Sequence, residues 1–388
     1  MLRGQMMDQP LLISSLIVHA DKNHGDTEIV SRTVEGPIHR YTYRDAHRRS
    51  KQLAQALQRH GVVAGDRIAT LAWNGYRHFE AYFGVSGMGA VIHTINPRLF
   101  PEQLVYIINH AEDKIVLFDN TFAPLIEKLA PLAKGVRGWI AMTDAANTAQ
   151  LKSKHAIPNL LCYEDLIGAE DGAFEWPEFD ERTASSLCYT SGTTGNPKGV
   201  LYSHRSTVLH AYGASLPDVF AASARETILP VVPMFHVNAW SIPYMSALNG
   251  CKLVFPGAAL DGKSLYELFE TEKVTTTAGV PTVWLGLLGF MKQGNLQFST
   301  LKRAVVGGSA APPAMIREFK ESFGVDCQHA WGMTEMSPLG TVATLQPEFA
   351  QLKGDAKLDV LSTQGFPPFM VEMKITDDAG KKLPWDGK

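Results

Sequence analysis

The sequence predicts an α/β protein in which helices cover largely parallel sheets, with a small β-subdomain near its end. Length and composition are the first indication: 388 residues, 45% hydrophobic and 19% charged, suit a globular chain of two or three domains or subdomains. Secondly, short apolar strands alternate with helical patterns in the first third and again after about residue 183. Thirdly, residues 371–375 alternate apolar and polar side chains, which is typical of a half-exposed antiparallel strand.

Helices and strands alternate along the first third of the chain. Residues 10–20 form an apolar run that we interpret as an amphipathic first helix, because no small-residue cleavage site of a signal peptide follows it. Thr42 and Asp45 have the spacing of a capping box, and the helix that they begin is expected to end at Gly61. A strand, two helices and a second strand are expected next, at residues 67–72, 76–88, 101 onward and 114–118.

The same alternation resumes in the second half of the chain. We expect a helix at residues 264–271 and strands at residues 185–190, 252–255, 275–278 and 301–306. The intervening stretch 143–180 is rich in Ala, Asn, Asp, Glu and Gly and is expected to hold surface connections. A turn sequence, Asp377–Gly380, follows the last predicted strand.

Charge and cysteine content argue against several classes of protein. The formal net charge is -3, without the basic excess of a nucleic-acid binder or a basic block for anionic lipid. The sequence contains no run of about 18 apolar residues, so it predicts no membrane span. The cysteines lie far apart and form no CxxC pair, so we expect reduced thiols in the cytoplasm rather than a disulfide framework or a structural zinc site. They are Cys162, Cys188, Cys251 and Cys327.

One segment combines hydroxyls, glycines and a lysine behind an apolar strand: YTSGTTGNPKGV at residues 189–200. Glycines let backbone N–H groups approach an anion closely, hydroxyls add donors, and Lys198 adds a mobile positive charge. Such a loop can hold a triphosphate or pyrophosphate. It is not a Walker A loop, because Gly-Lys-Ser/Thr never occurs. A flexible linker is the alternative, which the preceding strand and the terminal lysine disfavour.

Three further segments carry residues suited to ligand binding: PMFHVNAW at 233–240, VGGSAAP at 306–312 and HAWGMTE at 329–335. Each has an alternative interpretation. His236 by itself is more often a satisfied core histidine, and simple core packing is the alternative for Trp240. A turn of two glycines after a strand is common, and Glu335 alone is typical of a solvated surface.

Taken in order, the four segments resemble the signatures of the adenylate-forming superfamily. This superfamily contains acyl-CoA synthetases, adenylation domains of non-ribosomal peptide synthesis and firefly-type luciferases. The resemblance implies a large N-terminal adenylate-forming domain over residues 1–388, with two helix-covered sheets and the start of a small β-subdomain. Its approximate subdomains would be residues 1–183, 184–338 and 339–388.

The family continues past these motifs into a Thr-Gly-Asp segment and a small mobile C-terminal domain with a lysine that assists adenylation. We find no match to either, so the resemblance implies that this domain is missing and that residues 1–388 alone adenylate poorly. A non-enzymatic ATP- or acyl-binding module that ends at Lys388 is the alternative.

The resemblance also assigns site residues. Lys198, His236, Thr334 and Glu335 would be catalytic, and Thr190 with Glu335 would hold Mg²⁺, which favours oxygen ligands. The ATP and AMP site would comprise Thr190, Ser191, Gly192, Thr193, Thr194, Gly195, Lys198, Gly308, Ser309, His329, Ala330, Trp331, Gly332 and Thr334. The acyl pocket would comprise His236, Val237, Trp240 and Gly307.

The form of the second segment is similar to that of medium- and long-chain acyl-CoA synthetases. It implies an AMP-forming ligase that uses ATP, Mg²⁺ and coenzyme A to activate a fatty acid through an acyl-adenylate. A short-chain, sulfur-containing or aryl acid is the alternative substrate. An amino acid is disfavoured, because no acidic residue is placed to hold its ammonium group. Chain length stays open, and the resemblance suggests a homodimer, with no nucleic-acid or integral membrane contact.

Overall fold

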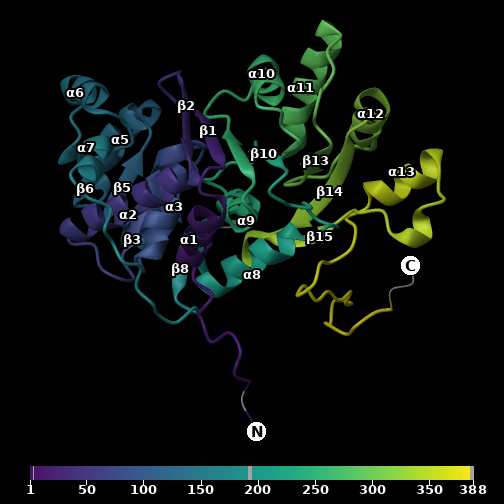
Figure 1. The fold of residues 1–388 in the computed structure, drawn as a ribbon, viewed down its shortest axis with the longest axis horizontal. Coiled ribbons are helices and arrows are strands. Elements are labelled where there is room, and N and C mark those ends of the chain that lie inside the picture. The colour runs from purple at the N-terminus through teal and green to yellow at the C-terminus, as the bar shows by residue number, and fades with distance from the viewer. Residues whose placement is uncertain (3, 191–194, 385–388) are drawn as a thin grey trace.

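Two mixed, mostly parallel sheets organise the protein in a computed structural model that describes residues 1–2, 4–190 and 195–384 (Figure 1). The first sheet has the strand order β7 (Leu160–Cys162), β6 (Gly138–Ala141), β5 (Ile115–Phe118), β3 (Arg67–Leu71), β4 (Val91–Thr94), β8 (Ala184–Thr190) and β9 (Lys198–Ser203). The second has the order β15 (Leu339–Val342), β14 (Asp326–Gly332), β13 (Arg303–Val306), β12 (Thr276–Gly279), β10 (Thr227–Pro230), β11 (Lys252–Phe255), β1 (Glu28–Arg32) and β2 (Ile38–Thr42). Neighbouring strands run parallel except for the pairs β1/β2, β8/β9 and β14/β15.

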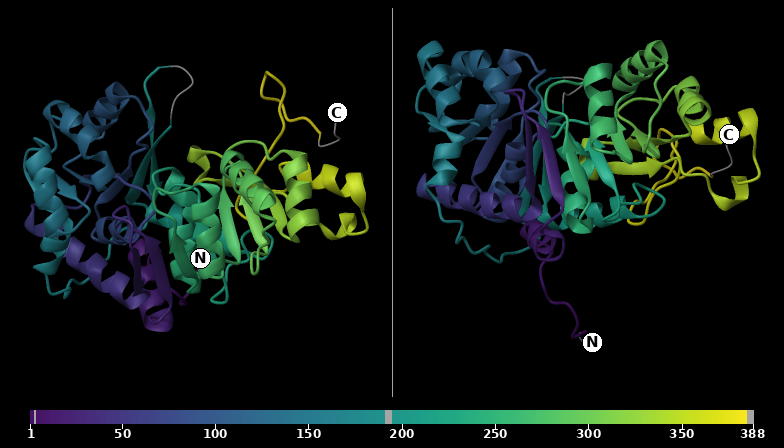
Figure 2. Two further views of the ribbon diagram at one scale, coloured as in Figure 1. Left: turned by 90° about the horizontal axis from the view of Figure 1, so that it is seen from above. Right: turned by 45° about the horizontal axis from the view of Figure 1, so that its top comes forward.

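Helices cover both faces of each sheet. Between the sheets lie α1 (Ile13–His24), α2 (Tyr43–Arg59), α3 (Tyr76–Gly87), α8 (His204–Ser215) and α9 (Ile242–Asn249), whose apolar residues share one core with both sheets. The outer face of the first sheet packs against α4 (Pro101–His110) and α5 (Ala123–Leu129). The outer face of the second packs against α10 (Gly262–Thr271), α11 (Pro281–Gly294) and α12 (Pro313–Phe323). Figure 2 shows the two helix-covered sheets side by side.

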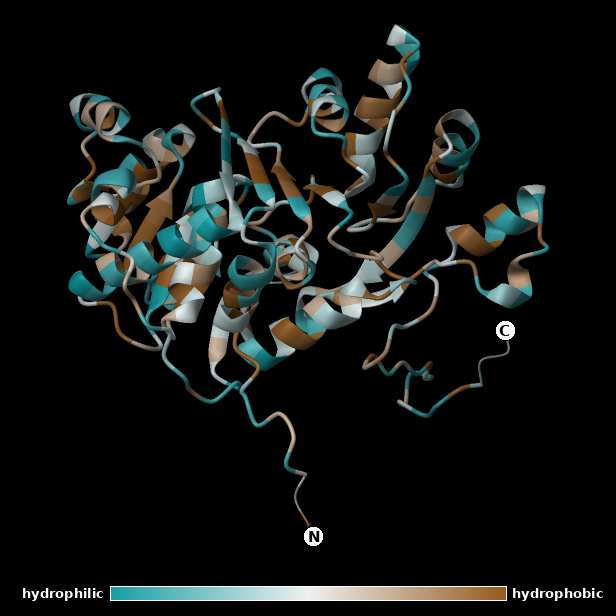
Figure 3. Ribbon diagram, viewed as in Figure 1, coloured by the Kyte–Doolittle hydropathy of each residue, from teal (hydrophilic) through white to brown (hydrophobic). Residues whose placement is uncertain are grey.

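Strand periodicity explains how one strand serves two cores. Successive side chains of a strand point to opposite faces, so both faces of a buried strand must be apolar. In β10, Ile228 joins the core between the sheets, and Leu229 joins the outer core. Strands such as β5 and β11 are accordingly hydrophobic along most of their length (Figure 3).

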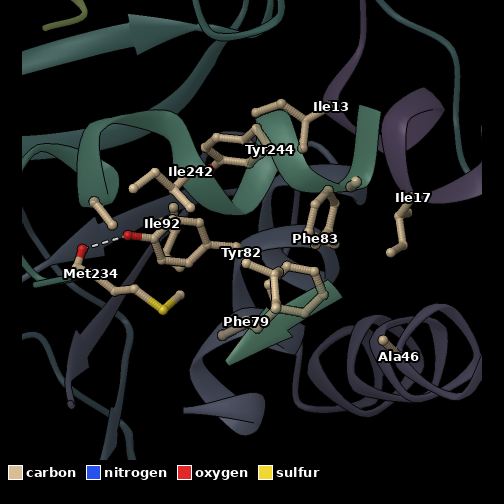
Figure 4. Packing of buried hydrophobic residues seen from close by; sticks show 14 of the residues in the cluster. Ile13, Ile17, Ala46, Phe79, Tyr82, Phe83, Ile92, Met234, Ile242 and Tyr244 are labelled. Carbon is tan, nitrogen blue, oxygen red and sulfur yellow. Dashed lines mark hydrogen bonds between the residues drawn. The ribbon is translucent and has the colours of Figure 1, made fainter. Parts of the chain in front are cut away.

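Aromatic side chains dominate the packing between the sheets. Tyr82 and Phe83 of α3 meet Tyr244 of α9 at ring-centroid distances of 5.4 and 5.7 Å (Figure 4). Buried aromatic pairs of this kind contribute about 0.5–1.5 kcal/mol beyond their burial. This contact fixes α9, and with it the chain that precedes α9, against the first half of the protein.

Most of the predicted elements are confirmed. The capping box forms: the Asp45 backbone N–H donates to Thr42 Oγ1, and the Thr42 N–H donates to Asp45 Oδ2 at 3.1 Å. The first helix, the strands near residues 67, 115, 185, 252, 276 and 303, and the helices near residues 76, 101 and 264 all occur within a few residues of their predicted limits.

Two local predictions are wrong. Residues 143–180 hold α6 (Ala145–Lys154), β7 and α7 (Tyr163–Gly168) in addition to connections. Asp144 caps α6 by accepting the Asn147 N–H at 2.8 Å, but α6 buries only Thr148 and therefore shows no apolar stripe. The strand β7 is apolar, but its three residues are too few for a recognisable pattern. Residues 371–375 form no strand, because no strand of residues 4–190 and 195–384 lies beside them; an isolated bridge pairs the next residue, Thr376, with Lys382.

Membership of the sheets crosses the suggested subdomain limits. β1 and β2 come from the start of the chain but extend the second sheet, whereas β8 and β9 extend the first. β15 lies beyond residue 338 and pairs with β14, and α13 (Gly354–Ser362) follows it. The subdomain limits near residues 183 and 338 therefore stay a prediction. In the described part of the chain, no helix combines the length and the apolar character that crossing a membrane requires.

Three buried histidines predict how stability depends on pH. Burial lowers the pKa of His78, His204 and His210 to about 4. In the unfolded chain each titrates near pH 6.5, so between these values the unfolded state binds protons that the folded state does not. The free energy of unfolding should therefore fall with falling pH, by about 1.4 kcal/mol per pH unit for each histidine. Chemical denaturation at about pH 7 and about pH 5 measures this loss.

The variant His204→Gln is the control for this prediction. Burial raises the pKa of Asp119 to about 7, which acts in the opposite direction, so the comparison must isolate one histidine. The loss of stability between the two pH values should be smaller in His204→Gln than in the unaltered protein by about 1.4 kcal/mol per pH unit. Equal losses in both proteins would contradict the assignment of a neutral buried His204.

Candidate functional site

Three of the four predicted motifs lie at the carboxyl ends of strands that meet at one edge of the second sheet, whereas the segment 189–200 lies on the β8/β9 hairpin of the first. Because β10, β12, β13 and β14 are parallel, the chain leaves each of them in the same direction. The register pairs Gly279 with Val306 and Val306 with His329, so the segments after β12, β13 and β14 start side by side. Loops at this edge are where ligands bind in open parallel sheets.

A cavity of about 170 Å³ opens among these segments, and it is open to solvent. Apolar surface predominates, as in most small-molecule sites. The predicted residues that line it are His236, Val237, Trp240, Gly307, Gly308, Ala330, Trp331, Gly332 and Thr334.

The segment that carries Trp240 has an unusual backbone. The short helix η3 (Val237–Ser241) has positive φ at every position, from 42° at Val237 to 67° at Ser241, and none of its residues is glycine. A left-handed conformation costs non-glycine residues roughly 1–2 kcal/mol each, so the surrounding structure must hold this turn. The turn places Trp240 against Gly307, where a Cβ would come within 3.1 Å of the indole and 2.9 Å of the Ala330 carbonyl oxygen.

His236 lies at the wall of the pocket with an accessible side chain. The surrounding protein nevertheless removes enough water to lower the pKa of His236 below its ordinary value of 6.5. The imidazole is therefore neutral near pH 7. A neutral ring at this place can accept or donate a hydrogen bond without adding charge to the pocket.

Trp331 and Thr334 also line the pocket. Trp331 is half-buried in β14 and faces Gly340, the position in β15 at which a Cβ would approach the indole to 2.5 Å. Thr334 begins the short helix η4 (Thr334–Met336), and its carbonyl oxygen accepts a hydrogen bond of 2.5 Å from Tyr202 Oη. A glycine thus leaves room for the flat ring, and Tyr202 of the first sheet holds the segment after it.

The β8/β9 hairpin presents the predicted phosphate loop. Thr190 is the register partner of Lys198, and its hydroxyl lies 3.5 Å from the Lys198 carbonyl oxygen. The Lys198 side chain is exposed, and Gly195 has a φ of 93°. Ser191, Gly192, Thr193 and Thr194 lie outside the described residues. The hairpin therefore brings the two ends of the predicted loop together.

A magnesium ion would need oxygen ligands from both sheets. Glu335 is exposed on η4, and η4 and β8 approach each other to within 8 Å between Cα atoms. One carboxylate and one hydroxyl, with phosphate oxygens and water, suit the hard-oxygen preference of Mg²⁺. In residues 1–2, 4–190 and 195–384 no group of three or more His, Cys, Asp or Glu side chains forms a metal cluster. The chemistry of the donors thus fits a cation shared with a bound phosphate.

Two predicted residues occupy other surroundings. His329 is buried: the Ala311 N–H donates to its Nε2 at 3.3 Å, so Nδ1 carries the proton and lies 3.0 Å from the Thr363 carbonyl oxygen. Its side chain therefore supports the turn after β13 rather than facing the pocket. Ser309 is exposed beside Gly308 but does not line the pocket.

Several residues of this site were not found from the sequence. His210 of α8 lines the pocket, and its Nε2 accepts the Leu339 N–H at 3.2 Å (Figure 1 shows α8 beside β15). Leu339, Phe220 and Val342 add apolar surface. These pocket residues belong to no motif, and their spacing in the sequence indicates only that they are buried. The contact between α8 and β15, which the sequence does not reveal, is what brings them to the pocket.

Comparison with known proteins identifies relatives along nearly the whole chain. Residues 17–388 match the family described as AMP-binding enzyme. A medium-chain-fatty-acid–CoA ligase of Ectopseudomonas oleovorans is 51% identical over 99% of this chain and 70% of its own length. A 3-methylmercaptopropionyl-CoA ligase of Ruegeria pomeroyi is 50% identical over 99% of this chain and 71% of its own. A long-chain-fatty-acid–CoA ligase of Thermus thermophilus is 44% identical, with shares of 99% and 68%.

Solved structures share the fold at low sequence identity. The structure of an anthranilate CoA ligase in complex with anthranoyl-AMP superimposes with a TM-score of 0.84 at 22% identity. It covers 97% of this chain and 68% of its own length. The arrangement of two helix-covered sheets is therefore that of a known class of proteins.

The contact between Gly340 and Trp331 predicts the effect of a single added methyl group. In Gly340→Ala the new Cβ would lie 2.5 Å from the indole, so the ring must move out of its place in the pocket wall. Overpacking of this kind costs about 1–3 kcal/mol, and we expect the affinity for AMP to fall by about tenfold. Calorimetric titration with AMP measures it.

Gly286→Ala is the matched control, because Gly286 is exposed on α11 with no atom within 4 Å of the position of its Cβ. This change should leave AMP affinity unaltered and stabilise the helix by about 0.4–1 kcal/mol. An unchanged AMP affinity in Gly340→Ala would show that Trp331 has no part in the site.

Proposed function

Since the chain belongs to the family of AMP-binding enzymes, we propose that it acts as an ATP-dependent, AMP-forming acyl-CoA ligase for a medium- or long-chain fatty acid. One observation carries this proposal: His236, Trp240, Trp331 and Thr334 all line a single, largely apolar pocket. A nucleotide and an acyl group can therefore meet in one cavity, as the joining of a carboxylate to AMP requires.

The wall formed by β13 and β14 suits the adenosine end of the nucleotide. Trp331 offers a flat aromatic face on which adenine can stack. The backbone of Gly308, Ala330 and Gly332 borders the same space, with Ser309 at its exposed margin and His329 supporting the turn from behind. We assign the adenine and ribose contacts to this wall.

The β8/β9 hairpin and η4 suit the phosphates. Thr190, the loop to Gly195 and Lys198 would surround the β- and γ-phosphates with hydroxyl, N–H and ammonium donors. The predicted loop residues Ser191, Gly192, Thr193 and Thr194 complete this assignment. Thr334 would bind the α-phosphate, and Glu335 with Thr190 would hold Mg²⁺ beside it. The ion would neutralise phosphate charge and polarise the bonds to the leaving pyrophosphate.

The reaction has two steps. A carboxylate oxygen attacks the α-phosphorus of ATP and pyrophosphate leaves, which forms the acyl-adenylate. The thiolate of coenzyme A then attacks the acyl carbonyl, and AMP leaves with the bonding electrons. Both steps depend on alignment and charge neutralisation, to which Lys198, Thr334 and the neutral His236 would contribute.

The apolar end of the pocket favours an acyl chain. A second cavity adjoins the first at His210 and Leu339, and Leu209, Ala214, Phe369 and Met370 help to line it. Each methylene that enters such a space gains about 0.8 kcal/mol. The additional apolar space supports a medium- or long-chain substrate.

A short sulfur-containing acid is the second candidate. Relatives at 50% identity include 3-methylmercaptopropionyl-CoA ligases, almost as similar as the medium-chain ligase. We further propose a cytoplasmic location, which the free, buried cysteines support. Pairing into a homodimer is proposed on the family resemblance.

A panel of carboxylates tests the function and its substrate class. The intact natural protein should exchange pyrophosphate with ATP, and form acyl-CoA, most efficiently with acids of medium or long chain. The value of kcat/KM should rise about threefold to fourfold for each added methylene that is buried, the equivalent of about 0.8 kcal/mol. Highest efficiency with 3-methylmercaptopropionate would select the alternative, and no exchange with any acid would refute the proposal.

The neutral His236 predicts the acid limb of the pH profile. Protonation would place a cation beside the attacking carboxylate and weaken it as a nucleophile. Since burial lowers the pKa of His236, activity should persist as pH falls to 6.5 and decline only below it. His236→Asn, which cannot ionise, should lower kcat and remove this limb. An identical acid limb in the variant would assign it to another group.

A further inference from the structure

Asn74 lies outside every motif of the sequence, in the connection between β3 and α3. Its side chain is 4% exposed and makes three hydrogen bonds, all to the backbone of one distant segment. Asn74 Nδ2 donates to the carbonyl oxygens of Pro230 and Val232, at 2.9 Å each, and Asn74 Oδ1 accepts the Met234 N–H at 2.6 Å. The amide thus uses both of its donor hydrogens and its acceptor on residues 230–234.

This segment leads directly to the acyl wall of the pocket. Met234 is held at both of its backbone groups, because Tyr82 Oη donates to its carbonyl oxygen while Asn74 accepts its N–H (Figure 4). His236 follows two residues later and Trp240 six residues later. The Asn74 carbonyl oxygen also accepts the Gly257 N–H at 3.1 Å, which fixes Asn74 itself between the two sheets.

The left-handed turn after Met234 requires such a hold. Five successive residues without a glycine do not adopt positive φ through local preference. Within the turn, Asn238 Nδ2 donates to Ser186 Oγ of β8 at 2.8 Å. Asn74 therefore fixes the chain where it enters the turn, and Asn238 fixes the turn in its middle.

We infer that Asn74 is a positioning residue of the ligase, which sets the places of His236 and Trp240 through the backbone of residues 230–234. This inference rests on the proposed function. Asn74 does not itself line the pocket, so it acts on the substrate only through this segment.

Only an amide satisfies all three backbone partners. In Asn74→Asp the carboxylate still accepts from the Met234 N–H, but it directs negative charge at two carbonyl oxygens that have lost their donor. In Asn74→Leu all three backbone groups lose their partner. Both changes keep the approximate size of the side chain, so a cavity does not explain their effects.

The closing experiment compares these variants with Gln52→Glu. Gln52 of α2 is a buried amide that donates to the Glu170 carbonyl oxygen at 2.7 Å, remote from the pocket lining. We expect Asn74→Asp to lower kcat/KM for the fatty acid by roughly 100-fold, as small displacements of reacting groups do, with KM for ATP little changed. Gln52→Glu should lose stability and keep both kinetic parameters.

Two readouts separate positioning from loss of stability. The activity of Asn74→Asp, relative to that of the unaltered protein at the same pH, should recover in part as pH falls, because a protonated carboxyl can donate to one carbonyl. Asn74→Leu should show no such recovery. Hydrogen exchange should accelerate in residues 230–241 of both Asn74 variants and not in Gln52→Glu. Should Asn74→Leu fail to fold, Asn74→Asp alone carries the comparison.

The outcomes are distinct. If the kcat/KM of Asn74→Asp for the fatty acid stays within a few-fold of that of the unaltered protein, Asn74 has no positioning role. The same conclusion follows if the KM for ATP rises by as much as kcat/KM for the fatty acid falls. Unchanged exchange at residues 230–241 also overturns the inference, whatever the activity. If the unaltered protein forms no acyl-CoA with any acid, the proposed function fails, and the exchange comparison still decides whether Asn74 holds this segment.

Discussion

The parallel alignment of β10, β12, β13 and β14 is the constraint on which the candidate site depends. Strands that run side by side in one direction must release their chains at one edge, so segments 23 to 48 residues apart in the sequence begin as neighbours. Gly279, Val306 and His329 share one level of this edge through their register. Shifting one strand by a residue would turn its side chains to the other face and remove its loop from the pocket.

Besides the direction of the strands, polar contacts between the two halves of the protein hold the parts of the candidate site together. Tyr202 of β9 bonds the Thr334 carbonyl oxygen, and Ser186 of β8 accepts from Asn238. Both bonds are shielded from water, where a satisfied polar pair holds its partners firmly and an unsatisfied one is costly. The phosphate hairpin belongs to the first sheet and the adenine wall to the second, so these bonds maintain the distance between the two ends of the site.

Local elements with strong signals were predictable because their causes lie within a few residues. The capping box of Thr42 and Asp45 and the apolar strands near Phe118 and Phe255 need no distant partner to be recognised. Residues 145–168 were missed because α6 buries only Thr148, and β7 and α7, with three and six residues, are too short for a periodic pattern. Residues 371–375 show the reverse: an alternating pattern forms a strand only where another strand accepts its hydrogen bonds.

The sequence by itself determined which residue types could do chemistry and in what order they occur, from the hairpin at Thr190 to the carboxylate of Glu335. Tertiary structure decided which of them face one cavity: His236 and Trp331 do, whereas the ring of His329 is turned to the backbone behind it. Tertiary structure also revealed the contacts of Asn74, because a hydrogen bond between residues 160 positions apart in the sequence leaves no local pattern. The physical reason is that periodicity and motif spacing record short-range preferences, while pockets arise from contacts between elements that only folding brings together.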